Sequence, residues 1–196
     1  MGCGLYPSLC LLNTCCDQNM TKVYSGTSVT GLVAKVIRAG EEVSDNCSPT
    51  AVYTPRQERR DWLAQHFMFH CECQACSQNL PLAEDMPEHP ERFICQKCSH
   101  PGLTRNESEC PECGERFDFV KQNDNVMNLV LAFNNCVRQY QCSQRADPMD
   151  YFLSLQDLYT KLRSMVSHPY KLLVYTEQQY LKAMKQVYGN KIMARK

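Results

Sequence analysis

The spacing of the cysteines constrains this chain more than any other feature of its sequence. There are 14 cysteines in 196 residues, and short spacings group them as Cys71-x-Cys73-x-x-Cys76, Cys95-x-x-Cys98 and Cys110-x-x-Cys113. Sulfurs at such spacings converge on one metal ion and are badly placed for disulfides between distant elements. The N-terminal stretch also lacks the basic flank of a secretory signal. The sequence therefore predicts metal-binding thiolates in a reducing compartment.

The two C-x-x-C pairs predict a zinc-ribbon-like site. Its four ligands are Cys95, Cys98, Cys110 and Cys113, and 11 residues separate the two pairs. Four thiolates close a tetrahedral shell with no open position, which is typical of structural zinc. Zinc binding contributes on the order of 10 kcal/mol to the folding of such a core-poor segment. The alternative is a pair of disulfides or free thiols.

The remaining group, Cys71, Cys73 and Cys76, supplies only three ligands. Structural zinc sites are almost always four-coordinate, so a fourth ligand must come from elsewhere in the chain. By their chemistry the candidates are His66, His70 and a distant cysteine.

Charge and hydropathy exclude two classes of partner. The formal net charge is zero, with 21 basic and 21 acidic residues, which gives no electrostatic basis for nucleic-acid binding. No basic aromatic face surrounds the C-x-x-C pairs, which argues against a zinc-dependent nucleic-acid binder. No apolar run is long enough to span a membrane.

Local patterns predict an α+β fold. Strands are expected at 21–24 and 28–36, and a helix at 56–67 after Pro55. From residue 123 onward the pattern predicts three amphipathic helices, with Asp147 capping the second and Gly189 ending the third. Short turns between them imply antiparallel packing. The expected buried stripes are Val126, Leu129, Phe133, Val137 and Tyr140; Phe152, Leu155, Tyr159, Leu162 and Val166; and Leu173, Tyr180, Leu181, Met184 and Val187.

Three segments resemble those of SET-domain lysine methyltransferases. The stretch from Gly2 to Asn13, followed by Cys16 and Asn19, resembles the Asn-His-Ser-Cys-x-Pro-Asn region of that family. The segment 37–43 resembles the Gly-Glu-Glu segment that follows, and Cys71-x-Cys73-x-x-Cys76 resembles the post-SET cysteine cluster. The Leu-Tyr-Pro lead-in, the helix with Arg59-Arg60 and the helical tail resemble the SET-and-MYND (SMYD) branch, especially its members with tetratricopeptide repeats.

The resemblance implies a domain order and a ligand set. Residues 1–60 correspond to the C-terminal part of a SET domain, 61–78 to a post-SET zinc segment and 79–91 to a linker. Residues 92–119 form a second zinc knuckle pair, and 120–196 a tetratricopeptide-like helical tail. The family's motif cysteine falls at Cys16, which makes Cys16, Cys71, Cys73 and Cys76 the first zinc site. Two zinc ions are therefore expected.

The resemblance also implies an S-adenosylmethionine site with altered chemistry. In the family, Asn and His of the motif hold this cofactor, and two tyrosines line the methyl-transfer channel. Here Asn13 is kept, Thr14 replaces the histidine, Cys47 replaces the first tyrosine and Phe67 the second. A thiol is a weaker donor than a phenol, and phenylalanine has no hydroxyl. The expected cofactor-binding residues are Cys10, Leu12, Asn13, Thr14, Phe67 and Phe69.

Two functions follow from these substitutions. The first is a catalytically impaired SMYD-type protein that acts as a zinc-scaffolded protein-interaction module. The alternative is an active S-adenosylmethionine-dependent protein-lysine N-methyltransferase, or its C-terminal part, in which another hydroxyl or a water replaces the phenol. The family's Gly-x-Gly cofactor strand and MYND finger lie upstream of the matching segments, outside residues 1–196. Either function implies a protein substrate or partner, no nucleic acid or membrane, and a cytoplasmic or nuclear location.

Overall fold

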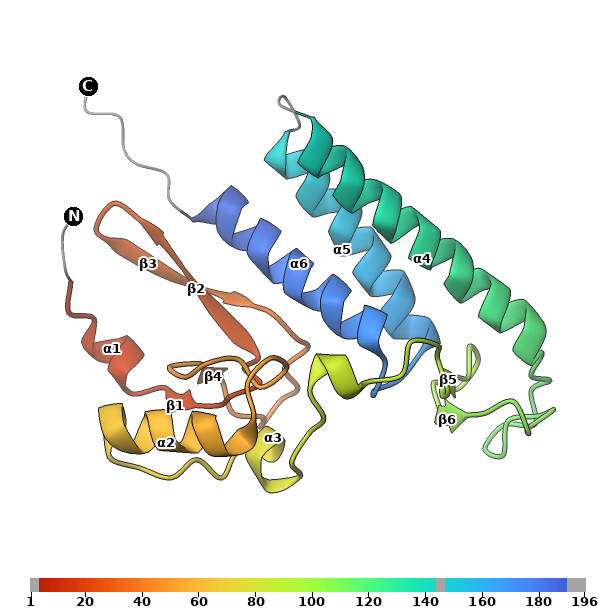
Figure 1. Ribbon diagram of the computed structural model, residues 1–196, viewed down its shortest axis with the longest axis horizontal. Helices are drawn as coiled ribbons and strands as arrows, with labels where there is room; N and C mark the ends of the chain where they lie inside the picture. The colour runs from red at the N-terminus through yellow and green to blue at the C-terminus, as the bar shows by residue number, and fades with distance from the viewer. Residues whose placement is uncertain (1–3, 144–146, 190–196) are drawn as a thin grey trace. The chain divides into compact units, whose positions relative to one another are not determined.

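The computed structural model describes residues 4–143 and 147–189 (Figure 1). The chain divides into two compact units, one formed by residues up to Glu84 together with those from Met184, the other by Asp85–Ala183. The division falls in the segment predicted as a linker, which carries the short 3-10 helix η1 (Ala83–Asp85). Both units combine helices with short strands, so the fold class is α+β.

The strands of the first unit form two small sheets. Strand β1 (Asn13–Thr14) pairs in parallel with β4 (Ser44–Asp45), and β2 (Met20–Ser25) pairs antiparallel with β3 (Ser28–Val33). A two-residue turn joins β2 to β3, and its Gly26 has a positive φ of 59°, as tight hairpin turns require. Strands β2 and β3 lie where the two strands were predicted, and they form a hairpin.

Strand β3 ends three residues earlier than the pattern predicts. The N–H groups of Ala34 and Lys35 both donate to the carbonyl oxygen of Asn19, at 2.7 and 3.2 Å, so the chain leaves the ladder after Val33. A short helix, α1 (Pro7–Cys10), precedes the strands and was not anticipated in a segment expected to hold strands and turns.

Helix α2 (Arg56–Phe67) has the predicted bounds and begins after Pro55. It ends where Met68 adopts a left-handed conformation and its N–H donates to the Ala64 carbonyl. Leu63 of α2 is fully buried against the cysteines and against Ala75 of helix α3 (Gln74–Ser77). The core of this unit is thus built around its thiols: Cys16, Ala51, Leu63, Cys71, Ala75 and Cys76, with Trp62 and Cys73 packed against them.

The second unit begins with an antiparallel pair that was not predicted, β5 (Phe93–Ile94) and β6 (Pro101–Leu103). Phe93 is fully buried, with its ring 5.7 Å from that of Phe117 and 5.5 Å from that of Phe119. It also forms a backbone bridge with Val166. Two-residue strands of this kind carry too little pattern to be read from sequence.

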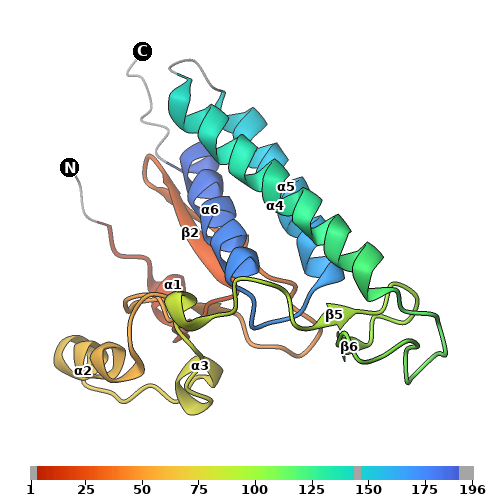
Figure 2. The same ribbon diagram turned by 45° about the vertical axis from the view of Figure 1, so that its right-hand side comes forward.

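Helices α4 (Phe119–Cys142) and α5 (Pro148–Met165) lie in the second unit. Helix α6 (Lys171–Tyr188) belongs to the second unit up to Ala183 and to the first unit from Met184. Both views show α4 and α5 side by side and running in opposite directions (Figures 1 and 2). The rings of Tyr140 and Tyr151 stack at 3.9 Å between them. The predicted antiparallel packing is therefore confirmed for α4 and α5. Helix α4 starts four residues before the predicted position, because Asp118 caps it by accepting from the Lys121 N–H.

The residues predicted to be buried on each helix are buried to different degrees in the structure. All five residues of the α5 stripe are buried. On α4 only Val126 and Phe133 are buried, and on α6 Leu181 and Val187 are only half-buried. The α6 face also buries Thr176 and Glu177, polar residues that a hydrophobic pattern does not include. Within the described part of the chain, no helix combines the length and apolar character needed to cross a membrane.

The cap of α5 gives a first test of this helical unit. The Asp147 carboxylate accepts from the Met149 N–H at 2.8 Å. Asp147→Ala should therefore lower the free energy of unfolding by about 1 kcal/mol, measured by urea denaturation. Asp157→Ala is the matched control, since Asp157 makes only an exposed ion pair with Lys161, worth about 0.3–0.5 kcal/mol. Equal losses from both variants would contradict a specific capping role.

Candidate metal centres

Eight cysteines gather into two groups of four. The first cysteine centre consists of Cys16, Cys71, Cys73 and Cys76, and the second cysteine centre of Cys95, Cys98, Cys110 and Cys113; within each group the sulfurs all lie within 4.8 Å of one another. Measured Sγ–Sγ distances are 3.6 and 3.8 Å. Tetrahedral zinc with bonds of about 2.3 Å places its sulfurs about 3.8 Å apart, whereas a disulfide requires about 2.05 Å. Both groups can hold a metal ion, and every cysteine in the described residues is free.

The first cysteine centre joins three separate segments of the first unit. Cys16 follows β1, Cys71 and Cys73 lie in the loop after α2, and Cys76 lies in α3. The structure brings Cys16 to the other three as the fourth sulfur. The two histidine candidates are elsewhere: His66 Nδ1 hydrogen-bonds with the Trp62 carbonyl, and His70 is exposed.

Backbone contacts hold Cys16 against the segment that follows β4. The N–H of Cys15 donates to the Asp45 carbonyl at 2.8 Å, and the N–H of Ala51 donates to the Cys16 carbonyl at 3.2 Å. The Ser48 hydroxyl donates to Cys16 Sγ at 3.4 Å. The parallel β1–β4 pairing therefore fixes a sulfur ligand as well as a strand.

Three arginines of α2 face the loop that carries the other ligands. Arg60 Nε donates to the Cys71 carbonyl at 3.1 Å and Arg56 Nη1 to the Cys76 carbonyl at 3.4 Å. Arg59 Nη2 lies 3.5 Å from Cys76 Sγ. Burial opposes the charged form of Arg59, but hydrogen bonds to Cys76 and Cys16 outweigh it and raise the pKa of the guanidinium. Arginines at helical spacing immediately before a cysteine cluster are the sequence signal that could have identified them.

A fifth thiol adjoins the first cysteine centre. The nearby thiol of Cys73, together with burial, raises the pKa of Cys15. The thiols of Cys15 and Cys16 in turn lower the pKa of Cys73. Cys15 also lies 3.3 Å from the Asp17 carbonyl, to which its thiol donates. The thiolate form, which binds metal, is therefore favoured at Cys73.

The second cysteine centre is built from two similar knuckles. The N–H of Ser99 donates to the Cys95 carbonyl, and that of Gly114 to the Cys110 carbonyl, each at 2.9 Å. Both donors have positive φ, 61° and 66°. Backbone N–H groups of Cys98 and Lys97 lower the pKa of Cys95 to about 6. The backbone geometry of the knuckle thus favours the thiolate form of Cys95 in the metal-free chain.

The two centres differ in their surroundings. In the second, Cys98 is exposed, and the neighbouring Lys97 forms an exposed ion pair with Glu115. In the first, three of the four ligand cysteines are buried and face the buried Arg59. The same ligand set therefore occurs once near solvent and once in a core.

The predicted cofactor-binding residues are only partly brought together. Asn13 Nδ2 donates to a Glu42 carboxylate oxygen, and Thr14 pairs with Asp45, whose carboxylate is buried and ion-paired with Lys22. The Asn13–Glu42 contact joins the segment around Asn13 to the segment 37–43, the first two of the three segments that resemble the SET family. Cys10 is exposed and Leu12 is half-buried.

The predicted channel residues lie in two other places. Phe67 ends α2, is 49% exposed and packs at 5.6 Å against Trp62 of the same helix. Phe69 follows at the surface. Cys47 is half-buried in the turn between β4 and α2.

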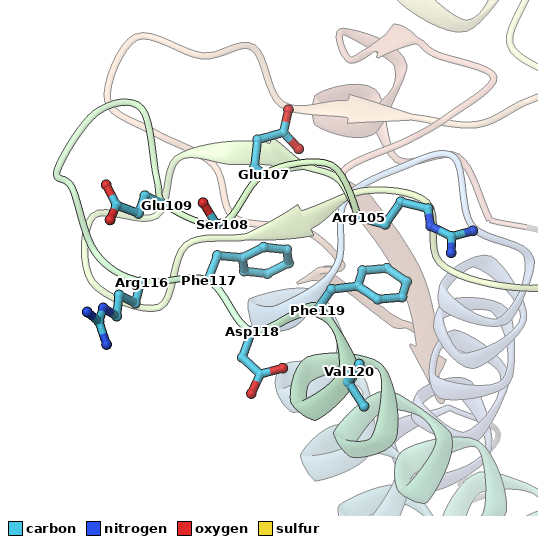
Figure 3. Close-up of a pocket in the computed structure, with 9 residues that line it drawn as sticks. All are labelled: Arg105, Glu107, Ser108, Glu109, Arg116, Phe117, Asp118, Phe119 and Val120. Atoms are coloured by element: carbon cyan, nitrogen blue, oxygen red, sulfur yellow. The ribbon is translucent and has the colours of Figure 1, made fainter.

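A hollow of about 450 Å³ lies in the second unit where the second cysteine centre meets α4 (Figure 3). Figure 3 shows the rings of Phe117 and Phe119 in it, with Arg105 over Phe119 at 5.8 Å and Asp118 pointing away. Its polar groups have local partners: Asp118 caps α4, and Glu107 accepts from the Thr104 hydroxyl and N–H. None of the predicted site residues lines this hollow. Its lining consists of side chains from the knuckle segment and from the start of α4 that meet there.

Together these features define an α+β protein with two groups of four cysteines, each of which could hold a metal ion. No family model matches the chain. It is 31% identical over 132 residues to a SET and MYND domain-containing protein of Dictyostelium discoideum, covering 67% of this chain. It is 38% identical over 76 residues to the histone-lysine N-methyltransferase SMYD3 of Mus musculus, and 30% identical over 95 residues to the protein-lysine N-methyltransferase SMYD4 of Mus musculus, covering 39% and 48% of this chain.

These similarities identify the chain as a relative of the SMYD proteins, a family of SET-domain lysine methyltransferases. The aligned stretches cover 10%, 17% and 12% of those three relatives. The chain thus corresponds to a small part of each relative's length.

Proposed function

We propose that this chain is a SMYD-type SET segment in which two zinc centres scaffold a protein-interaction module and methyl transfer is impaired. The observation that carries the proposal is the convergence of Cys16 with Cys71, Cys73 and Cys76, next to the parallel pairing of β1 with β4. That arrangement joins all three segments that resemble the SET family. In this reading residues 1–60, 61–78, 92–119 and 120–196 are the SET part, post-SET segment, knuckle pair and tetratricopeptide-like tail, with 79–91 as a linker.

Both centres suit zinc by their chemistry. An all-thiolate, four-coordinate set with sulfurs at tetrahedral separations is the donor set of structural zinc. The first centre would tie the post-SET loop to the strand that carries Asn13. The second would hold the β5–β6 pair together. Neither shell leaves a position for a substrate, so each ion would be structural. Zinc held by thiolates also favours a reducing compartment, the cytoplasm or nucleus.

S-adenosylmethionine, when bound, supplies a methyl group for displacement by a neutral lysine amine. The residues proposed to hold it are Cys10, Leu12, Asn13, Thr14, Phe67 and Phe69. Alignment and polar groups around the methyl would carry catalysis. Cys47 and Phe67 stand where the family has tyrosines, so neither channel position offers a phenol to orient the amine. The Asn13 amide is also already bonded to Glu42. We therefore expect methyl transfer to be impaired by Cys47, Phe67 and the existing bond of Asn13.

The proposed interaction surface lies on the helices of the second unit. Leu131 of α4 and Leu153 of α5 are large apolar side chains that remain exposed. Repeats of paired helices commonly bind proteins on such surfaces. The expected partner is a protein, either a substrate or a binding partner.

The alternative function is an active protein-lysine N-methyltransferase, or the C-terminal part of one. The retention of Asn13 favours it, because this residue stands at the position of the family's cofactor-binding asparagine.

Calorimetric titration of S-adenosylmethionine into the zinc-loaded chain separates the two functions. The interaction module predicts no saturable heat, because the chain's own candidate residues are exposed or already bonded. The double variant Cys47→Tyr with Phe67→Tyr, joined to the upstream half of a relative, then tests the missing phenols in a methylation assay. A gain of turnover assigns the defect to these two positions. Saturable binding by the unaltered chain would contradict the impaired reading and favour the enzyme.

A further inference from the structure

Arg59 is a buried cation with no carboxylate beside it. Its side chain is 1% exposed, and no ion pair with an acidic residue involves it anywhere in residues 4–143 and 147–189. Nη1 donates to the carbonyls of Ala51 and Thr54, while Nε has no hydrogen-bond partner. Carbonyls satisfy donors but do not balance a full charge. An arginine this deep needs a counter-charge, because burying an unpaired ion is costly.

The sulfurs of the first cysteine centre are the groups that can supply this charge. Nη2 of Arg59 lies 3.5 Å from Cys76 Sγ, and the sulfur of Cys76 lies 3.6 Å from that of Cys16 in the same centre. A zinc ion with four thiolates carries a net charge of −2. Cys16, Cys71 and Cys76 are buried, so this anion has little contact with water. A buried anion and a buried cation therefore face each other, and each offsets the other's desolvation.

We propose that Arg59 is the counter-cation of the first zinc–thiolate centre and sets how tightly that centre retains its ion. This inference rests on the zinc occupancy proposed above. Arg59 acts as a positioning residue: it does not ligate the metal, but it stabilises the thiolate form of the ligands that do. The hydroxyl of Ser48, 3.4 Å from Cys16 Sγ, assists without adding charge.

The second cysteine centre provides an internal comparison. The cation nearest to it in sequence, Lys97, is exposed and paired with Glu115. Its thiolates are balanced by backbone N–H groups and by water. The first centre should therefore lose zinc more slowly than the second when both are exposed to the same chelator.

The experiment measures zinc release from the full chain to a chromophoric chelator. Arg59→Met removes the charge at similar volume, and about a 10–100-fold faster release is expected from the first centre alone. Arg59→Lys keeps the charge and should restore part of the retention. Arg38→Met is the matched control, because it removes an exposed arginine of the same unit, which pairs with Glu41 and not with the cysteine centre. Alkylation mapped by mass spectrometry assigns each release phase to its cysteines.

A second readout separates charge compensation from simple packing. In the cobalt-substituted protein, sulfur-to-metal charge-transfer bands of the first centre should shift in Arg59→Met and largely return in Arg59→Lys. If Arg59→Met does not fold, Arg59→Gln and Arg59→Lys replace it. Lysine should then retain zinc better than glutamine, because it keeps the charge.

Each outcome has a distinct meaning. Unchanged release and spectra in Arg59→Met, or better retention with glutamine than with lysine, would overturn the role of Arg59. A wild-type chain that binds one zinc, with Cys71→Ser leaving that stoichiometry unchanged, would instead overturn the first zinc centre itself.

Discussion

Replacing Cys110 with serine is expected to reduce the zinc content from two ions per chain to one. Cys110 is almost fully buried in the second cysteine centre, where its sulfur lies 3.6 Å from that of Cys98. A serine hydroxyl stays protonated near neutral pH and is a poor ligand for zinc. Metal analysis of the purified variant, compared with the unaltered chain, measures the change directly.

The loss of that ion should unfold the knuckles as well. Between Cys95 and Cys113 the structure offers little besides Leu103 to form a core. Zinc binding is worth about 10–16 kcal/mol in small zinc-folded peptides, so the segment between Cys95 and Cys113 should lose its fixed structure. Amide exchange within β6 would rise sharply. Cys142→Ser changes an exposed cysteine at the end of α4 and should leave both zinc and exchange unaltered. Two retained ions in Cys110→Ser would refute the assignment of this ligand set.

Lowering the pH should release zinc from the second cysteine centre over a pH range that depends on the pKa of Cys95. The pKa of Cys95 is lowered to about 6 from an ordinary value near 9 by the N–H groups of Cys98 and Lys97. Because folding lowers this pKa, the Cys95 thiolate contributes fully to the stability of the folded state above the ordinary pKa of a cysteine. That contribution is lost as the pH falls through about 6. Bound zinc competes with protons for the same sulfur, so in an acid titration zinc should stay bound at about pH 6 and be displaced only at a lower pH.

The sequence predicted the elements that carry strong local signals. Helix α2 follows Pro55, and α5 begins with the Asp147-Pro148 pair, because caps and fixed φ angles act within a few residues. The composition of both cysteine centres could likewise be read from spacing, with Cys16 supplied only through the resemblance to the SET family. Cys16 lies 55 residues from Cys71, and no periodicity connects residues at that separation.

Features that depend on tertiary contacts were missed. The end of β3 is set by the Asn19 carbonyl, which captures two N–H groups from a strand whose own pattern continues. Arg59 appears in sequence as one charge on an exposed helix, and its burial becomes visible only when Cys16 and Cys76 converge on it. The β5–β6 pair is too short to show alternation, although its Phe93 is fully buried and contacts Phe117, Phe119 and Val166.

Phe93→Ala is expected to destabilise the second unit by about 3–5 kcal/mol, the usual cost of removing a buried ring. Phe93 is fully buried, contacts the rings of Phe117 and Phe119, and forms a backbone bridge with Val166 at the end of α5. Its removal leaves a cavity that β5, the knuckles and the helices all line. Val120→Ala is the matched control, because Val120 lies close by at the start of α4 but is 67% exposed.

Denaturation followed by two probes gives the measurement. Helix content reports α4 and α5, and zinc release reports the second cysteine centre. If Phe93 links the helices to the second cysteine centre, the midpoints of both transitions should fall to lower urea concentrations in Phe93→Ala. Both midpoints should be unchanged in Val120→Ala. A shift in zinc release alone would show that the helices are stable without the ring, and a cost below about 1 kcal/mol would be too small for a core aromatic residue.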